Sequence, residues 1–270
     1  MTALPFGSTR AKQRGRWYSS LRVRLAVAIA LLVALTGLGA SWLALRLARQ
    51  ALVAEVTGIA TRAATRAVQE LVRLGDLEPL RVFAKASNEL TVGEMRQLSA
   101  LDALAFSEED YEFLIRAKTA ALFSAATEVG ALCGATRVRD ALARYGAYLG
   151  MAFQVVDDLL DYTEAAETVG KPTGLDLREH KVTLPLIAVL SRMSPAARRV
   201  VDQLFASPEP SDPQIAQVIE IVRDAGGLDY ARRRGEEYAD RAEESLASLP
   251  STPARAALHD TLTYVMGRRS

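Results

Sequence analysis

The sequence predicts an all-α protein, and three observations support this fold class. From about residue 50 onward, apolar residues recur at the three- and four-residue spacing of amphipathic helices. No segment shows the sustained apolar–polar alternation of a half-buried strand. Breaks such as Gly75-Asp76 and the proline-rich stretch 207–213 separate the periodic segments. The chain has 270 residues, 50% of them hydrophobic, so it can bury a sizeable core.

The first 70 residues differ in composition from the rest of the chain. Residues 1–24 make up a basic N-terminal arm, and residues 25–45 are 21 consecutive residues without a charge. Because such a run is long enough to cross a bilayer, we predict a transmembrane helix there, with a buried core helix as the alternative. Positive charge is denser before the run than after it, which favours a cytoplasmic N-terminus. Residues 46–70 are predicted to form a connecting helix.

Residues 71–270 are predicted to form a helical domain. The acidic stretch Ser107–Asp110 is typical of a helix N-terminus, and Pro185 lies near the start of a later helix, where proline is tolerated. The predicted helices lie at about 78–98, 111–122, 137–163 and 181–193, and two or three more follow.

The composition excludes several classes of function. A net charge of +1 and 6% aromatic residues give neither the field nor the stacking surface of a nucleic-acid-binding protein. The single cysteine, Cys133, excludes an internal disulfide and is predicted to be a small core residue. The two histidines, His180 and His259, share no ligand spacing with each other or with the cysteine. The sequence therefore indicates neither a zinc site nor a nucleophile triad.

The most informative segment is 153–161, where three carboxylates interrupt an otherwise apolar helical run. On a helix, Gln154 and these carboxylates fall within one arc of about 100°. Like charges at this spacing repel by about 0.2–0.5 kcal/mol per pair, so the arc requires a counter-charge. The carboxylates are those of Asp157, Asp158 and Asp161.

Lysines supply candidate counter-charges. The chain contains 28 arginines and only 5 lysines, and Lys118, Lys171 and Lys181 flank the acidic segment or lie on a helix that could face it. A compact ammonium binds phosphate as a point charge, although a solvated surface position is the alternative for each lysine. Carboxylates on one face with lysines nearby suit a Mg²⁺ ion that shares its ligands with phosphate oxygens. This combination indicates diphosphate chemistry.

Three segments resemble the second half of the trans-type polyprenyl diphosphate synthases, which include octaprenyl and other long-chain enzymes. They are FQVVDDLLDYT at 153–163, GKPTGLDLREHKVTLPL at 170–186 and GEMRQL at 93–98, in the family's order. The resemblance covers about residues 70–270. It implies an isoprenoid-synthase-like helical bundle that condenses isopentenyl diphosphate with an allylic diphosphate in isoprenoid biosynthesis. Mg²⁺ is the implied cofactor.

The resemblance also implies roles for residues near the acidic helix. The aspartates would bind Mg²⁺ on the allylic diphosphate, and the two lysines after them would hold that diphosphate. Asp176 resembles the acid in the loop between those lysines. The implied metal ligands are Asp157, Asp158 and Asp161, and the implied catalytic residues are Asp157, Asp158, Lys171 and Lys181.

The implied substrate-binding residues come from several helices. Lys118-Thr119 resembles a pair that contacts the diphosphate and the allylic tail, while Phe153 and Gln154 would line the cavity wall. Glu94 and Gln97 match a helix that lines the product cavity, with ordinary helix-face positions as the alternative. The substrate-binding set is Lys118, Thr119, Phe153, Gln154, Lys171, Lys181 and Gln97.

The family's first aspartate-rich motif has no counterpart in this sequence. No aspartate precedes Asp76, and the only acids before it are Glu55 and Glu70. Because ionisation of the diphosphate needs metal coordination, we expect an incomplete bundle with little or no activity alone. The alternatives are a non-catalytic partner subunit of a complete synthase and a membrane-anchored helical module that binds diphosphate.

The resemblance implies partners and a location. The substrates would be allylic diphosphate and isopentenyl diphosphate, and the second chain would be a copy of this one or a complete synthase. We expect no nucleic acid, and membrane insertion through 25–45. The family implies the cytoplasm or the cytoplasmic face of the membrane, which conflicts with the topology that the positive charges predict.

Overall fold

The structure is a computed structural model that describes residues 75–99, 102–163 and 173–268, with further positions between 65 and 73. Every regular element in these ranges is helical and none is a strand, which confirms the predicted all-α class. The chain divides into two units, residues 1–73 and 74–270, and all the labelled helices below belong to the second.

The predicted transmembrane helix at 25–45 lies outside the described residues, as do the arm at 1–24 and most of the connecting helix at 46–70. Within the described ranges, no helix combines the length and the apolar character needed to cross a membrane. In the first unit, the described positions between 65 and 73 are helical.

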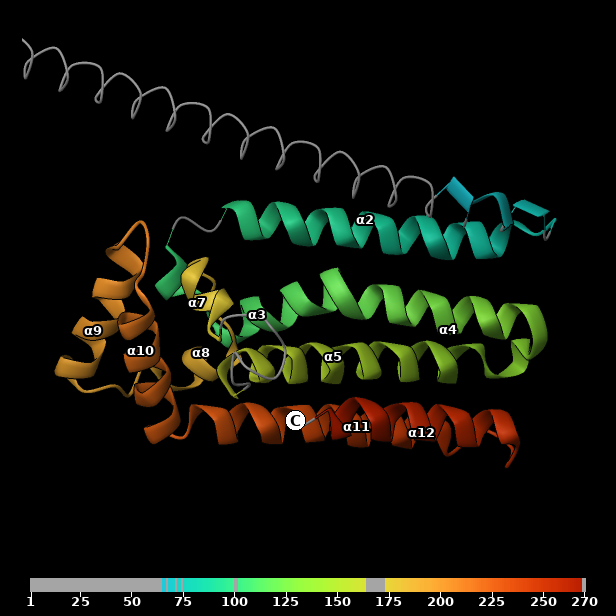
Figure 1. The fold of residues 1–270 in the computed structure, drawn as a ribbon. Coiled ribbons are helices and arrows are strands. Elements are labelled where there is room, and N and C mark those ends of the chain that lie inside the picture. Colours follow the sequence, from blue (N-terminus) through green and yellow to red (C-terminus); the bar gives the residue numbers. More distant parts are fainter. Residues whose placement is uncertain are drawn as a thin grey trace, which may run out of the picture. The chain divides into compact units, whose positions relative to one another are not determined.

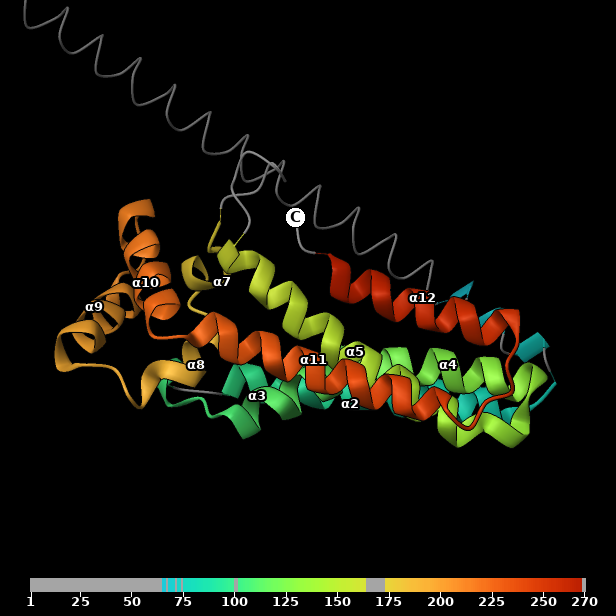
Figure 2. The ribbon, with the colours of Figure 1, turned by 90° about the horizontal axis from the view of Figure 1, so that it is seen from below.

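Long helices lie lengthwise beside one another in the second unit, with α5 in the middle (Figures 1 and 2). α5 packs against α4 on one side and α11 on the other, and α2 covers α4. These helices are α2 (Leu77–Ser99), α4 (Ala121–Gly134), α5 (Arg139–Thr163), α11 (Gly227–Leu246) and α12 (Pro253–Gly267). Shorter helices gather at one end, namely α7 (Leu175–Arg178), α8 (Leu184–Leu190), α9 (Pro195–Ala206) and α10 (Asp212–Asp224).

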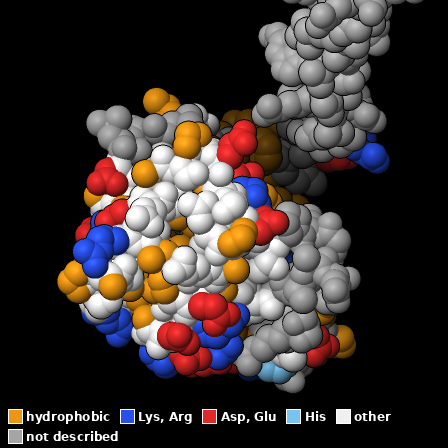
Figure 3. All heavy atoms as spheres, turned by 60° about the vertical axis from the view of Figure 1, so that its left-hand side comes forward, with side chains coloured by type: hydrophobic (Ala, Val, Ile, Leu, Met, Phe, Trp, Pro, Cys, Tyr) orange, Lys and Arg blue, Asp and Glu red, His pale blue; other side chains and the backbone are white. Residues whose placement is uncertain are grey.

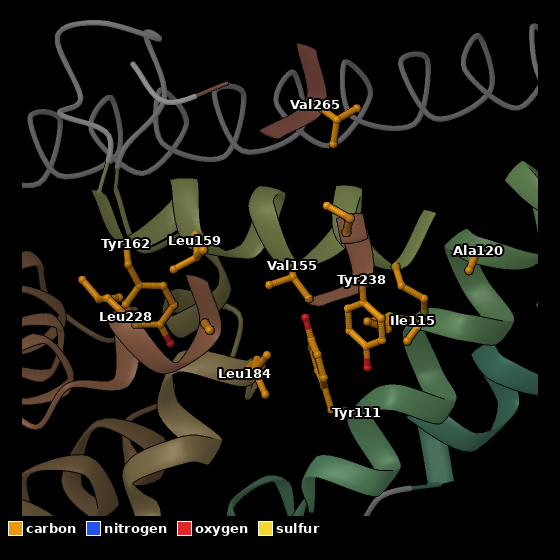
Figure 4. Close-up of a cluster of buried hydrophobic side chains, with 14 of the residues drawn as sticks. Tyr111, Ile115, Ala120, Val155, Leu159, Tyr162, Leu184, Leu228, Tyr238 and Val265 are labelled. Atoms are coloured by element: carbon orange, nitrogen blue, oxygen red, sulfur yellow. The ribbon is translucent and has the colours of Figure 1, made fainter. Parts of the chain in front are cut away.

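The core follows the inner face of α5. Tyr145, Met151 and Val155 of this helix are each 0% exposed. Figure 4 shows Val155 with Tyr111 and Tyr238 beside it, from two other helices. Full burial of a large apolar side chain contributes about 1.5–3 kcal/mol, so this face holds α5 in a fixed rotation. The opposite, polar arc of α5 then faces the region described below.

The segment before α4 is a nearly continuous helix with a wide turn in it. α3 (Glu108–Ile115) begins at a capping box, in which Ser107 and Asp110 bond to each other's backbone N–H, as the acidic stretch predicts. Residues 116–120 then form a π-helical turn, η2, that leads into α4. Such turns are often found at functional sites. η2 carries Lys118 and Thr119.

A glycine lets η2 lie directly against α5. A Cβ added at Gly150 would lie 2.6 Å from the Cα of Ala120. No side chain fits at that distance, so the close approach of the two helices depends on glycine at this position. The contact sets the distance between Thr119 on η2 and Gln154 on α5.

Three predictions about the elements need correction. The helix expected at 181–193 is shorter, because α8 spans only Leu184–Leu190 and Lys181 lies in the turn before it. Four described helices follow α8, where two or three were expected, because Ser194 caps α9 and Gly226 (φ +78°) separates α10 from α11. Cys133, expected in the core, is exposed near the end of α4. The long helix expected at 137–163 is α5, which is confirmed within two residues.

The surface mixes charges of both signs. On the face shown in Figure 3, acidic and basic side chains lie close to one another, with apolar side chains between them. Large apolar side chains are also exposed on α2, where Val92 is 46% and Met95 is 66% exposed.

Candidate functional site

A cavity of about 500 Å³ lies beside the polar arc of α5. Its walls come from α2, from residues 103–106 between α2 and α3, and from α3, η2 and α5. The turn that joins α7 to α8 completes them. Both charged and apolar side chains line it, as a site for a charged group attached to a hydrocarbon requires. The lining residues are Glu94, Gln97, Ala103, Phe106, Tyr111, Leu114, Ile115, Lys118, Thr119, Gln154, Asp158, Asp176, Glu179, His180, Lys181, Val182 and Thr183.

A chain of hydrogen bonds crosses this cavity from η2 to α3. The Thr119 hydroxyl donates to Oε1 of Gln154 at 2.7 Å, and Nε2 of Gln154 donates to Oδ1 of Asp158 at 2.8 Å. The Tyr111 hydroxyl donates to Oδ2 of Asp158 at 2.6 Å. Both carboxylate oxygens of Asp158 therefore have a fixed partner, which orients the group from two sides.

Asp158 is a buried carboxylate with an altered protonation equilibrium. It is 5% exposed, and this burial raises its pKa to about 7, while the hydrogen bonds from Tyr111 and Gln154 oppose the rise. The carboxylates of Asp176 and Asp157 raise the pKa further. Burial and the nearby Asp158 also hold the pKa of the Tyr111 phenol well above its usual range. A cation in the cavity would favour the ionised form of Asp158.

Asp161 serves the neighbouring turn. Its Oδ1 accepts the N–H of Leu175 at 2.9 Å, and its Oδ2 accepts the N–H of Asp176 at 3.0 Å. Its carbonyl oxygen accepts the N–H of Gly174, which has φ +75°. Asp161 thus fixes α7 on the end of α5 and does not line the cavity.

Asp157 lies on the exposed side of the arc. Its side chain is 52% exposed, and its Oδ1 lies 3.7 Å from a guanidinium nitrogen of Arg268. The same guanidinium lies over the ring of Phe153, 5.1 Å from its centroid, and that ring packs against Phe123 at 5.3 Å. Asp157 and Phe153 are therefore outside the cavity lining, whereas Gln154 and Asp158 are in it.

Two of the three predicted lysines lie at the cavity, and each already has acidic partners. Nζ of Lys118 is 2.8 Å from Oε1 of Glu94 and donates to Oε1 of Gln97 at 3.3 Å. Nζ of Lys181 is 2.6 Å from Glu179 and 3.7 Å from Asp176. Lys171 lies outside the described residues.

The acidic partners of Lys181 alter two protonation equilibria. The hydrogen bond to Glu179 raises the pKa of the Lys181 ammonium, and Asp176 adds to the effect. Burial and the carboxylate of Asp161 raise the pKa of Asp176 to about 6, with Lys181 opposing. Lys181 therefore stays charged, and an anion that binds it must share it with carboxylates.

Comparison with known proteins decides the family. A family model described as polyprenyl synthetase matches residues 57–222, which is more than half of the chain.

The chain belongs to the polyprenyl synthetase family.

Individual members of the polyprenyl synthetase family show the extent of the similarity. The chain is 40% identical over 204 residues to all-trans-nonaprenyl-diphosphate synthase (geranyl-diphosphate specific) of Rhodobacter capsulatus, covering 75% of this chain and 62% of that one. It is 39% identical over 196 residues to octaprenyl diphosphate synthase of Escherichia coli (strain K12), covering 72% and 60%.

Solved structures of family members show a similar identity and coverage. A polyprenyl synthase from Caulobacter crescentus CB15, complexed with calcium and isoprenyl diphosphate, superposes with a TM-score of 0.71 at 36% identity, covering 76% of this chain and 63% of that one. A decaprenyl diphosphate synthase from Rhodobacter capsulatus gives a TM-score of 0.69 at 37% identity, covering 76% and 64%. The chain thus spans less than two thirds of the length of each of these four relatives.

The acidic residues of this site suit a divalent metal ion in part. Carboxylate oxygens are the donors that Mg²⁺ prefers, and it often takes only one or two of them together with phosphate oxygens and water. Among the described residues, no three acidic, histidine or cysteine side chains come together around one point. The side chain of Asp157 is exposed whereas that of Asp158 is buried, and Asp161 accepts hydrogen bonds from backbone N–H groups. The arrangement therefore fits an ion shared with a bound diphosphate better than a cage made of protein ligands alone.

Several cavity residues of this family member were not predicted from the sequence. Tyr111 was assigned only to a predicted helix at about 111–122, although a buried tyrosine hydroxyl needs a hydrogen-bond partner, which here is the carboxylate of Asp158. Glu179, His180 and Thr183 were placed next to or inside a predicted helix, so their position at a turn beside the cavity had no sequence signal. This turn depends on Asp161, because the side chain of Asp161 accepts N–H groups at the start of α7 and so fixes where α7 lies.

Proposed function

We propose that this chain is a polyprenyl diphosphate synthase-like prenyltransferase, which condenses isopentenyl diphosphate with an allylic diphosphate. One observation supports this most strongly: one cavity of the described part is lined by Asp158, Lys118 and Lys181 as well as by apolar side chains. Charged groups are suited to a diphosphate, and the apolar wall that includes Phe106 and Leu114 is suited to a hydrocarbon tail.

The residues that line the cavity have separate proposed roles. The ammonium groups of Lys118 and Lys181 bind the diphosphate and stabilise the negative charge that develops as it leaves the allylic carbon. Thr119 and Gln154 form a hydrogen-bonded pair that orients Asp158 at the cavity wall. The apolar wall excludes water, which would otherwise capture the carbocation. Lys171, in the same predicted diphosphate-binding set, would add a third cation.

Asp158 and Asp157 are the residues that we propose to hold Mg²⁺, with Asp161 as a third ligand of the acidic motif. When bound, the ion would neutralise charge on the departing diphosphate. Each carboxylate oxygen of Asp161 accepts one N–H, from Leu175 or Asp176, and keeps a second lone pair that could bind the ion. The position of Asp161 as a ligand is therefore tied to α7.

We propose that the chain alone has little or no activity. Residues 1–75 contain no aspartate, so this region offers no second aspartate-rich motif to face Asp157 and Asp158. If each absent carboxylate removes a few kcal/mol of transition-state stabilisation, two or three of them lower the rate by several powers of ten. A dimer, with a copy of this chain or with a complete synthase, could supply further acids. The exposed Val92 and Met95 on α2 support such an assembly.

The second candidate function is a non-catalytic subunit or membrane-anchored module that binds diphosphate without turnover. It is favoured by the fact that, within the described ranges, no three potential metal ligands converge. For either candidate we propose a location in the cytoplasm or at the cytoplasmic face of a membrane, and insertion through 25–45 remains a prediction.

A product assay tests the first proposal. Purified chain is given Mg²⁺, an allylic primer and radiolabelled isopentenyl diphosphate, beside the variant Asp157→Ala/Asp158→Ala. The matched control is Asp202→Ala/Asp224→Ala, which changes two aspartates on α9 and α10, far along the chain from the acidic motif. Elongated product that is lost only in the first variant supports a synthase.

The same preparation separates the two candidates. A folded wild type that makes not even a trace of product but binds inorganic diphosphate in the presence of Mg²⁺ supports the binding module, whereas slow but measurable turnover supports the synthase. A folded wild type that neither makes product nor binds diphosphate contradicts both. If the partner-subunit form is correct, addition of a complete synthase should give co-elution, and Asp157→Ala/Asp158→Ala should leave the activity of that synthase intact.

A further inference from the structure

His180 has an unusual backbone conformation beside the cavity. Among the described non-glycine residues it alone has a positive φ, at +56°. In this left-handed region a side chain crowds the backbone, which is why glycine is the usual residue there. A strained residue persists only where its surroundings hold it, and such residues cluster at functional sites.

The imidazole of His180 is held by the end of α9. Its Nε2 lies 2.8 Å from the carbonyl oxygen of Ser207. Because a carbonyl oxygen only accepts, Nε2 carries the hydrogen and donates it, whether the ring is neutral or protonated. The ring also meets Phe205 edge-on, with centroids 5.7 Å apart. α9 itself is anchored in the core through Val201 and Leu204, which are both 0% exposed.

The backbone at His180 determines where Lys181 goes. The N–H of His180 donates to the carbonyl of Leu177 at 3.1 Å, and the N–H of Lys181 donates to that of Asp176 at 2.8 Å. These bonds close a tight turn between α7 and α8. Lys181 follows directly, so a different φ at His180 would turn its ammonium away from the cavity that it lines.

We propose that His180 is a positioning residue for Lys181. Its ring, tied to the last residues of α9, holds the turn in a strained backbone conformation that directs the Lys181 ammonium at the bound diphosphate. This inference rests on the proposed function in one respect, namely that Lys181 binds diphosphate. His180 lies outside the acidic motif, and through it the position of Lys181 would depend on α9.

The test compares variants at the two histidines of the chain. His180→Gly removes the ring and suits φ +56°, so the variant is expected to fold. His180→Gln makes the same kind of change as the matched control His259→Gln, which affects an exposed histidine of α12 that bonds to Glu243 of α11. Lys181→Gln shows the effect of losing the cation itself.

Two measurements are made on each full-length variant. The first is hydrogen exchange of the backbone amides at 179–183, which needs no ligand. In His180→Gln, which loses the ring but keeps the cost of a positive φ, this exchange should rise about tenfold, because the turn opens locally, while α5 keeps its protection. The rise should be smaller in His180→Gly, because glycine adopts a positive φ without that cost. The second is calorimetric binding of inorganic diphosphate with Mg²⁺. Its Kd should rise about fivefold to tenfold in His180→Gln and approach the Kd of Lys181→Gln, because one positioned contact is lost in both. His259→Gln should change neither.

The outcomes separate the inference from the proposed function. If the wild type binds diphosphate and His180→Gln binds it equally well, the positioning role is overturned and the proposed function stands. Unchanged amide exchange in His180→Gln overturns the role as well, because the ring then does not hold the turn. A folded wild type that binds no diphosphate overturns both.

Discussion

At the scale of single residues, Asp158 depends on partners from two helices. It is 5% exposed, and its oxygens accept hydrogen bonds from Tyr111 at 2.6 Å and Gln154 at 2.8 Å. An isolated buried carboxylate is unfavourable, so these two bonds are what make the position tolerable. The three aspartates of the motif thus have three environments: Asp157 is exposed, Asp158 is buried, and Asp161 is bonded to backbone N–H groups.

We predict that Tyr111→Phe destabilises the protein by about 1–3 kcal/mol, because it leaves one oxygen of a buried carboxyl group without its donor. Urea-induced unfolding measures the loss. The matched control is Tyr264→Phe, which removes the hydroxyl of a residue that is 72% exposed, and it should leave the midpoint unchanged. Equal stability of Tyr111→Phe and the wild type would show that the Tyr111–Asp158 bond contributes nothing net.

At the scale of elements, the site depends on two helices approaching closely and on how a third begins. η2 lies against α5 at Gly150, and this contact brings Thr119 within 2.7 Å of Gln154. α3 begins at the capping box of Ser107 and Asp110, which fixes the helix that carries Tyr111. Gly150, Ser107 and Asp110 do not line the cavity themselves, yet they determine the positions of residues that do.

We predict that Gly150→Ala costs about 1–3 kcal/mol of stability, because the added Cβ would lie 2.6 Å from backbone atoms of Ala120 and force the helices apart. The control is Gly130→Ala, on α4, where a Cβ meets nothing within 4 Å. That change should be neutral or stabilise by up to about 1 kcal/mol, because alanine favours the helix. Thermal unfolding of both variants checks the difference, and equal melting temperatures would contradict the close-approach argument.

The cap of α3 should show a dependence on pH. Hydrogen bonds from Ser107, with help from Arg96, lower the pKa of Asp110 below its usual value. A carboxyl group whose pKa is lower in the folded state contributes stability above the unfolded pKa of about 3.9, and this contribution is lost as the pH falls through the folded value. Ser107→Ala should therefore cost about 1 kcal/mol near neutral pH and progressively less in acid.

Urea unfolding at a series of pH values measures this effect. The matched control is Ser194→Ala, which removes the cap of α9, a hydroxyl that accepts from the N–H of Ala197 at 3.2 Å without a carboxylate in the motif. Its cost should not change with pH. A constant cost for Ser107→Ala would show that Asp110 does not take part.

At the scale of the whole molecule, the cavity joins parts of the chain that are distant in sequence. Tyr111 and Asp158 are 47 residues apart, and Thr119 and Gln154 are 35 apart. The turn at 179–183 completes the same wall from a third region. A ligand that contacts all three should therefore stabilise the folded unit as a whole.

We predict that Mg²⁺ with inorganic diphosphate raises the melting temperature of the protein, and that removing the metal with a chelator abolishes the rise. A ligand at one hundred times its Kd adds about 2.7 kcal/mol of stability. Lys181→Gln should reduce the shift. Lys85→Gln, which changes a lysine on the exposed side of α2, should leave it intact. A shift that Lys181→Gln does not reduce would place the ligand elsewhere.

The sequence predicted the helices well because they depend on local information. The acidic cap at 107–110 and the apolar periodicity of 137–163 both lie within single elements, and both are confirmed. The prediction was wrong for the helix at 181–193, because the side chain of Asp161 holds the start of α7 and a turn then follows α7 at 179–183; the pairing of Asp161 with Asp176 spans 15 residues. It was also wrong for Cys133, whose exposure depends on how α4 packs.

By itself the sequence determined the all-α class, the carboxylate arc on α5 and the family resemblance, because periodicity, spacing and motif are properties of neighbouring residues. Only the tertiary structure decided which carboxylate faces the cavity. The apolar face of α5 fixes its rotation in the core, and that rotation turns Gln154 and Asp158 toward Thr119 and Tyr111 while it leaves Asp157 in solvent. Contacts between residues so far apart in the chain depend on the packing of whole helices, and no local pattern encodes them.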